Sequence, residues 1–198
     1  MKMQILDCDY VLVNGRPVVR LFCKDENGKA VCAFYDKYLP YFYLDIGDRD
    51  ITDVKYEFEK QNISFEIVER FLPIGYQEKP KKVFKIIGRD PSKTPEIREW
   101  ARKFGVPYEA DILFKYRFMT DFGLKGMGWI EVEGKIVHTK TVKCPAIEAE
   151  TIRPIEVMKN IPFRYLAIDT ETVLTEKTGL ADYARDPITM ISMRFYPE

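Results

Sequence analysis

Residues 164–173 read RYLAIDTETV, an apolar run that ends in two carboxylates separated by one residue. As a strand, Tyr165–Thr172 has a side-chain period of two, so Asp169 and Glu171 point to the same face and Thr170 points to the other. Two carboxylates that project together can hold a pair of divalent cations about 3.5–4 Å apart, an arrangement that stabilises the oxygens of phosphodiester hydrolysis. A solvated strand end carries the same D-x-E pattern, so the pair alone leaves both interpretations open.

The composition is that of a globular chain without a strong charge bias. With 198 residues there is room for one domain of usual size and part of another, and 46% hydrophobic residues are enough for a sizeable core. No run of about 18 apolar residues and no charged-then-apolar leader occurs, so we expect an intracellular protein without membrane contact. Lys plus Arg equals Asp plus Glu at 31 each. Any contact with nucleic acid must therefore be local.

The first part of the chain has the pattern of β-hairpins. Residues 3–35 alternate apolar and polar positions around Asn14-Gly15 and Asn27-Gly28, the strongest short-range hairpin signal. This pattern predicts a three-stranded meander.

A two-residue turn at Asn27-Gly28 would place Cys23 opposite Cys32. Opposed strand residues are close enough for a disulfide, but the geometry permits one without requiring it, and an intracellular chain usually keeps its thiols reduced. A bridge and two free thiols both remain open, with free thiols favoured.

Residues 41–110 predict the order strand, helix, strand, strand, helix, strand. The second helix has Pro95 in its first turn, where proline is tolerated. This order is that of the ferredoxin-like, or RRM-like, β-α-β-β-α-β unit, which RNA-recognition modules share with many proteins that bind no nucleic acid. The predicted elements are 41–45, 50–61, 63–71, 83–87, 94–104 and 106–110.

The remaining sequence predicts a short amphipathic helix over 111–121 and a hairpin over 129–141 that turns at Glu133-Gly134. The proline-containing segment 143–163 is predicted to connect two domains. A second strand over 188–195, joined through a loop at 173–187, would pair with the strand that carries the two carboxylates.

Several short motifs occur in one order along almost the whole chain: residues 3–28 (MQILDCDYVLVNGRPVVRLFCKDENG), 38–43 (YLPYFY), 90–98 (DPSKTPEIR) and 111–118 (DILFKYRF). In this order and spacing they resemble the N-terminal domain of archaeal family B DNA polymerases. The stretch YLAIDTET at 165–172 resembles the first exonuclease motif of the same family.

The resemblance implies an α+β fold: an N-terminal β-meander with the ferredoxin-like unit, followed by the first strands of an RNase H-like exonuclease domain. It also implies a domain division. Residues 1–142 would form a template-binding domain that recognises uracil, 143–163 a linker, and 164–198 the beginning of the 3′-5′ exonuclease domain.

The resemblance assigns chemistry to the carboxylate pair. Asp169 and Glu171 would be catalytic residues and ligands of Mg²⁺ or Mn²⁺ in a two-metal exonuclease site. The intact protein would be a cytoplasmic, nucleoid-associated DNA-directed DNA polymerase that binds single-stranded template and primer-template DNA. Its partners would be the remainder of the polymerase chain and a sliding clamp, contacted through parts not present in this sequence. This chain alone is expected to be inactive, because later exonuclease motifs and the polymerase carboxylates are missing.

The resemblance further implies a pocket that captures template-strand uracil. Two positions depart from the family: Thr94 stands where valine is usual, and Leu113 stands where proline is usual. Threonine is nearly isosteric with valine, but its hydroxyl must find a partner or stay hydrated. The residues that would line or support the pocket are Tyr10, Pro40, Tyr41, Pro91, Thr94, Ile112, Leu113, Phe114 and Arg117.

The residues themselves permit a nucleic-acid interface without the resemblance, since aromatic and proline faces hold unstacked bases and a basic stretch at 79–85 suits phosphates. The opposing interpretation is that the aromatics form core and the basic stretch is a solvated loop. Two further functions stay open. One is a free-standing, non-catalytic module for single-stranded or deaminated DNA, and the other is a structural domain whose pocket is vestigial.

Overall fold

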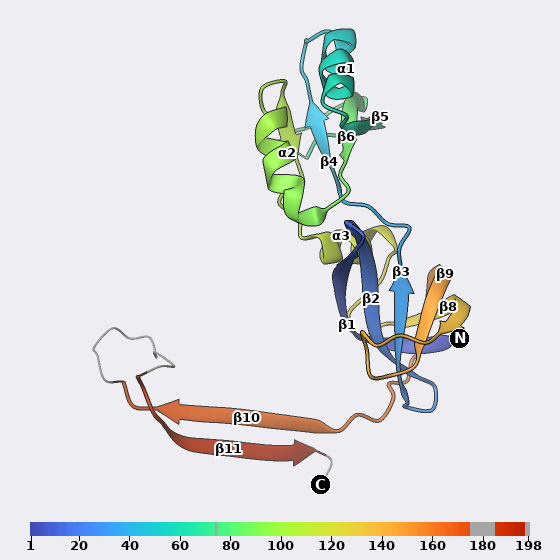
Figure 1. Cartoon of the computed structure of the whole chain (residues 1–198), viewed down its shortest axis with the longest axis vertical. Helices are drawn as coiled ribbons and strands as arrows, with labels where there is room; N and C mark the ends of the chain where they lie inside the picture. Colours follow the sequence, from blue (N-terminus) through green and yellow to red (C-terminus); the bar gives the residue numbers. More distant parts are fainter. Residues whose placement is uncertain (74, 175–184, 197–198) are drawn as a thin grey trace. The chain divides into compact units, whose positions relative to one another are not determined.

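The computed structural model describes residues 1–73, 75–174 and 185–196. The chain divides into two compact units, Met1–Asn160 and Ile161–Glu198. The described residues form a mixed α+β structure in which strands predominate (Figure 1).

The first unit contains a closed barrel with the strand order β1-β2-β3-β9-β8. The predicted meander is confirmed, because β1, β2 and β3 pair in sequence as antiparallel neighbours. Closure was not predicted, and it comes from β9, which pairs parallel to β3 and antiparallel to β8. The strands are β1 (Lys2–Val13), β2 (Arg16–Asp25), β3 (Ala30–Tyr35), β8 (Trp129–Val137) and β9 (Ala146–Ile155).

The connection between β2 and β3 differs from the predicted two-residue turn. The Asp25 carboxylate accepts hydrogen bonds from the backbone N–H groups of Asn27 and Lys29, at 2.9 and 2.8 Å. An aspartate that bonds to the backbone two residues onward stabilises its own turn. This side chain therefore sets a wider connection over residues 26–29.

The wider connection changes the register by one residue, so the predicted pairing of Cys23 with Cys32 is wrong. Cys23 lies opposite Val31, and Cys32 lies opposite Phe22. A slip of one residue sends the two thiols to opposite faces. All four cysteines are free thiols, and burial is the main cause that raises the pKa of Cys8 and of Cys32 to about 12.

The predicted hairpin at Glu133-Gly134 is also wrong. β8 runs through this dipeptide, and the register with β9 shifts there in a β-bulge. A Cβ atom on Gly134 would lie 2.1 Å from the carbonyl oxygen of Glu148, so glycine permits close approach of the two strands. The segment 143–163, predicted as a connection, therefore contains β9. Pro145 just before this strand and Pro154 within it had indicated a linker instead.

A four-stranded sheet of order β5-β6-β4-β7 forms the other part of this unit. Residues 42 and 44 of β4 and 84 and 86 of β6 point to one face, where they form a core with residues of α1 and α2. All the elements predicted between residues 41 and 110 occur. They are β4 (Tyr41–Asp45), α1 (Ile51–Lys60), β5 (Ser64–Arg70), β6 (Lys81–Ile87), the 3-10 turn η1 (Pro91–Lys93), α2 (Thr94–Ala101) and β7 (Val106–Tyr108).

Local capping explains where the two helical segments begin. The Asp50 carboxylate accepts from the Thr52 N–H at 2.7 Å and lowers its own pKa by doing so, and Asp90 caps η1 through the Ser92 N–H at 2.8 Å. Such caps satisfy N–H groups that have no partner inside the helix.

The helix α3 (Phe114–Asp121) lies within the predicted range 111–121. Phe114 and Phe118, one helical turn apart, are buried in the barrel core. Arg117, on the same helix, is buried as well. A buried arginine is uncommon unless it is paired, so its surroundings are described below.

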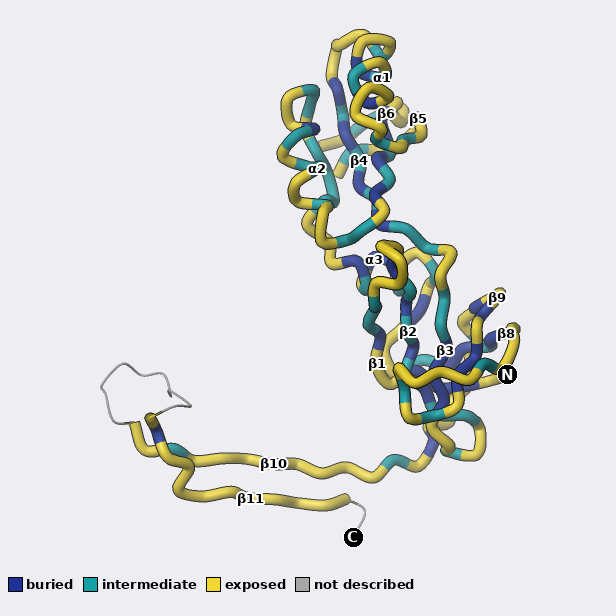
Figure 2. The backbone as a smooth tube through the Cα atoms, viewed as in Figure 1, coloured by how far each residue is buried: buried dark blue, intermediate teal, exposed yellow. Residues whose placement is uncertain are grey.

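In the second unit, β10 (Tyr165–Thr172) pairs antiparallel with β11 (Ile188–Tyr196), as predicted. Residues 175–184 of the loop predicted between these strands lie outside the described part of the chain. Figure 2 shows the two strands as exposed along their length. Among the described helices, none is long and apolar enough to cross a membrane.

The approach of β7 to β4 gives a prediction about stability. A Cβ atom on Gly105 would lie 2.1 Å from the Asp45 carbonyl oxygen and 2.9 Å from the Ile46 Cα. Gly105→Ala should therefore lower the free energy of unfolding by about 1–3 kcal/mol, because backbone must move to accommodate the methyl group. Urea unfolding followed by circular dichroism measures this change.

The matched control is Gly126→Ala, since nothing lies within 4 Å of a Cβ atom at Gly126. Its free energy of unfolding should stay within about 1 kcal/mol of the parent chain. Equal stability of the two variants would contradict the close approach at Gly105.

Candidate functional site

A cavity of about 530 Å³ lies within the first unit. It is formed where β1, the start of β4, the η1–α2 segment and the chain leading into α3 come together. The structure brings every residue that the sequence assigned to a pocket to the wall of this one cavity. They are Tyr10, Pro40, Tyr41, Pro91, Thr94, Ile112, Leu113, Phe114 and Arg117.

The cavity also has walls that the sequence reasoning missed: Pro95, Arg98, Ala110, Asp111 and Lys115. Adjacency was the signal available for most of them, because they lie beside assigned residues in the same motifs. Arg98 lies one helical turn after Thr94 on α2, and residues four apart share a helix face.

Two aromatic rings and Pro40 form one apolar part of the wall. Tyr10 and Phe114 contact each other edge to face, with ring centroids 5.0 Å apart. Pro40 is held by the Gly88 N–H, which donates to its carbonyl oxygen at 2.8 Å. A Cβ atom on Gly88 would lie 3.3 Å from the Pro40 ring, so glycine lets the backbone approach this wall closely.

The buried Arg117 has a strong partner on one side. Its Nη1 lies 2.6 Å from the Glu109 carboxylate, and its Nη2 donates to the Glu109 carbonyl oxygen at 3.2 Å. Glu109 has a φ of 61°, a conformation that few residues other than glycine adopt and that costs about 1–3 kcal/mol. Burial alone would lower the pKa of Arg117, but the hydrogen bond and charge of Glu109 outweigh it and the pKa is raised.

The other side of the guanidinium faces the cavity wall. Arg117 Cζ lies 4.8 Å from the centroid of the Tyr41 ring. Its Nε is buried and donates to no described atom, although a buried donor without an acceptor is costly.

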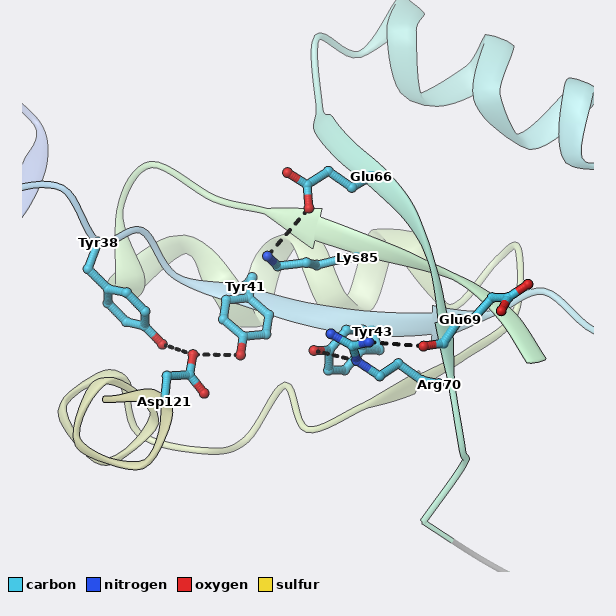
Figure 3. Close-up of polar contacts among 8 residues, drawn as sticks. All are labelled: Tyr38, Tyr41, Tyr43, Glu66, Glu69, Arg70, Lys85 and Asp121. Carbon is cyan, nitrogen blue, oxygen red and sulfur yellow. Dashed lines mark hydrogen bonds and ion pairs between the residues drawn. The ribbon is translucent and has the colours of Figure 1, made fainter. Parts of the chain in front are cut away.

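Tyr41 has contacts at its hydroxyl and at its ring. Its hydroxyl donates to Asp121 Oδ2 at 2.7 Å, and the hydroxyl of Tyr38 donates to the same oxygen at 2.6 Å (Figure 3). The Lys85 ammonium lies 4.6 Å from the Tyr41 ring centroid. Burial, and then the hydrogen bond to Asp121, raise the pKa of Tyr38 and of Tyr41, so both phenols are neutral donors.

The two positions that depart from the family pattern keep the backbone of the pocket. Leu113 precedes α3 with a φ of −59°, the value that proline would impose. Its carbonyl oxygen accepts from the backbone N–H groups of Tyr116 and Arg117 and so starts the helix. Thr94, the first residue of α2, is half-buried, which leaves its hydroxyl partly accessible to water.

The carboxylates of β10 form the second candidate site. Asp169 lies opposite Ser192 and Glu171 opposite Met190, so both carboxylates are on one face, and both are exposed. Asp169 accepts a hydrogen bond from the Thr170 N–H at 3.0 Å. Within the described ranges no cluster of three or more His, Cys, Asp or Glu residues could hold a metal ion. Asp169 and Glu171 are thus an exposed carboxylate pair on one face of β10.

Comparison with known proteins shows which family the chain resembles. Residues 105–198 match the family described as DNA polymerase family B, exonuclease domain. The DNA polymerase of Archaeoglobus fulgidus is 30% identical over 200 residues, which cover 96% of this chain and 24% of that protein. The DNA polymerase of Thermococcus sp. 9oN-7 is 35% identical over 126 residues, covering 61% of this chain and 16% of that protein.

A solved structure has the same fold. The family B DNA polymerase of the hyperthermophilic archaeon Pyrobaculum calidifontis superposes with a TM-score of 0.80 at 29% identity, covering 99% of this chain and 26% of that one. The Archaeoglobus fulgidus and Pyrobaculum calidifontis polymerases match nearly all of this chain, and the chain spans about a quarter of the length of each. On its sequence and its fold, the chain is similar to the family B DNA polymerases of archaea over nearly its full length.

Proposed function

We propose that this chain is the template-binding N-terminal part of a DNA-directed DNA polymerase, and that its cavity captures a uracil base from single-stranded template. The observation that carries the proposal is the convergence of Tyr10 from β1, Tyr41 from β4, and Phe114 and Arg117 from α3 on one cavity. A base taken out of a strand is held by aromatic or proline faces and read by polar groups along its edge. This cavity has such faces, and the polar side chains of Arg98, Asp111 and Lys115 also line it.

The proposed preference for uracil over thymine depends on the fit of the wall. The two bases differ by one methyl group, and a fitted pocket distinguishes one methyl group by only about 1–3 kcal/mol. A rigid wall is therefore required, and the buried pair of Arg117 with Glu109 supplies rigidity on the polar side.

The phosphates that flank the base would meet local positive charge. Lys115 lines the cavity, whereas Arg98, which also lines it, is paired with Glu99 at 2.9 Å, and Arg117 is paired with Glu109. The basic stretch at 79–85 contributes less than its composition indicates, because Lys81 lies 3.9 Å from Asp45 and Lys85 lies 3.4 Å from Glu66. Carboxylates close to these two ammonium groups reduce their attraction for phosphate.

We further propose that Asp169 and Glu171 are the first ligands of a two-metal 3′-5′ exonuclease site. Both are oxygen donors on one face, exposed and without an ion pair to any described residue, which suits Mg²⁺ or Mn²⁺. When bound, the metals would stabilise the attacking and leaving oxygens. In this proposal residues 164–198 begin an RNase H-like exonuclease domain, 143–163 includes the connection to it, and 1–142 is the template-binding domain. The sheet order β5-β6-β4-β7 supports a ferredoxin-like arrangement of residues 41–110 within the template-binding domain.

The partners proposed for the intact protein are single-stranded template, primer-template DNA, the remainder of the polymerase chain and a sliding clamp, all within the cytoplasm. A non-catalytic module for single-stranded or deaminated DNA is the second candidate. One observation favours it: the whole cavity is built within Met1–Asn160, separate from the carboxylate pair.

Binding of single strands tests the pocket. Fluorescence anisotropy should show that this chain binds a strand with one central uracil roughly three- to thirty-fold more tightly than the same strand with thymine, because the cavity excludes one methyl group. Thr94→Gln should fill the cavity and abolish the preference. Equal binding of both strands by the folded parent chain would refute uracil recognition.

The matched control is Glu150→Ala, an exposed residue of β9 that lies outside the cavity and 4.0 Å from the Lys135 ammonium. It should leave the ratio of the two affinities unchanged. A uracil preference that persists in Thr94→Gln would place recognition outside this cavity.

Proofreading tests the carboxylate pair. In a polymerase that contains this chain, Asp169→Ala combined with Glu171→Ala should remove 3′-5′ exonuclease activity by at least about 10³-fold while primer extension remains nearly intact, because the two reactions would use separate metal sites. Digestion of a labelled single strand and primer extension measure the two activities. A folded double variant that loses both, or neither, would contradict the assignment.

A further inference from the structure

The carboxylate of Asp121 joins two tyrosines that have different surroundings. Its Oδ2 accepts from the hydroxyls of Tyr38 and Tyr41 at 2.6 and 2.7 Å (Figure 3). Asp121 is the last residue of α3, whereas Tyr41 is the first residue of β4. Asp121 does not line the cavity, but Tyr41 does.

The Tyr38 ring is anchored in the core of the barrel. Its centroid lies 5.4 Å from that of Phe114 and 5.2 Å from that of Phe118. Asp121 is therefore held by a hydroxyl whose ring has little freedom to move. The Tyr41 ring is less closely packed: its centroid lies 5.6 Å from that of Tyr43 and 6.4 Å from that of Tyr38.

Two cations lie against the Tyr41 ring, the guanidinium of Arg117 at 4.8 Å and the ammonium of Lys85 at 4.6 Å. Cation–π attraction holds a ring in contact but tolerates rotation and sliding. A hydrogen bond from the hydroxyl to a carboxylate is directional and stronger than a neutral bond. Among these contacts, the bond to Asp121 is the one that fixes the direction of the ring.

We propose that Asp121 is a positioning residue of the pocket: through the hydroxyl of Tyr41 it fixes the ring that forms the cavity wall and so sets the width that separates uracil from thymine. The inference rests on the proposed function of the cavity. Because Asp121 is exposed, its role lies in orientation rather than in global stability. A wall that can turn would admit the thymine methyl group.

The experiment measures the ratio of the affinities for uracil and thymine strands, by anisotropy, in variants of the whole chain. Asp121→Ala should reduce this ratio by about threefold or more, toward equal binding. Asp121→Asn should restore it to within about twofold of the parent, because the amide oxygen still accepts from the tyrosine hydroxyls. Loss of a negative charge strengthens binding of both strands alike, so the ratio isolates the orientation of the ring.

A double-mutant cycle tests the route of the effect. Tyr41→Phe removes the hydroxyl and keeps the ring, and in this background Asp121→Ala should reduce the ratio no further. The control Asp48→Ala removes an exposed carboxylate in the loop between β4 and α1 and should leave the ratio unchanged. Thermal unfolding of each variant confirms that it is folded.

The outcomes separate this inference from the proposed function. If the parent chain prefers uracil and folded Asp121→Ala keeps the full preference, the positioning role is wrong and the uracil pocket stands. If Asp121→Ala lowers the uracil-to-thymine affinity ratio by the same factor in the Tyr41→Phe background as in the parent chain, the effect does not pass through the hydroxyl and the inference fails. If the parent chain binds both strands equally, the proposed function fails and the inference fails with it.

Discussion

The arrangement of the cavity depends on one buried cation. Arg117 leaves α3 between two buried phenylalanines and must be paired, because an uncompensated charge in such a place costs several kcal/mol. Glu109 provides both its carboxylate and its carbonyl oxygen, and holds an unfavourable backbone conformation in doing so. The strain and the ion pair are coupled, since the φ of 61° accompanies a carbonyl oxygen that faces the guanidinium. This contact ties the end of the sheet to the helix on the barrel, and the cavity lies where the two meet.

Polar side chains then order the wall around that cation. The Tyr41 ring lies against Arg117 and Lys85, and its hydroxyl and that of Tyr38 share one oxygen of Asp121. A wall built from directional bonds suits discrimination between ligands that differ by one methyl group.

The two candidate sites differ in how completely they are built. The cavity has walls from several elements of one compact unit. The carboxylates of β10 lie on an exposed two-stranded sheet, and a metal pair needs more ligands than two side chains supply. This chain spans about a quarter of the length of the polymerases that it matches over nearly its own full length.

The sequence by itself determined the local features of this protein. Alternation around Asn-Gly dipeptides predicted β1 to β3, helical spacing with Asp and Pro at helix starts predicted α1 and α2, and the D-x-E pattern placed Asp169 and Glu171 on one face of β10. These are properties of period, capping and order, which act over a few residues. The resemblance to archaeal family B polymerases, and not local pattern, supplied the residues assigned to the pocket, and the structure places them at one cavity.

Only the tertiary structure decided what depends on contacts between distant residues. The Asp25 side chain shifted the register that separates Cys23 from Cys32, and close approach to β9 made Gly134 a bulge instead of a turn. Closure of the barrel by β9, the pairing of Arg117 with Glu109, and the shared oxygen of Asp121 had no signal in local pattern. The physical reason is that strand pairing and buried charge pairing are settled by which partners the folded chain brings within hydrogen-bond distance, and sequence spacing does not encode that distance.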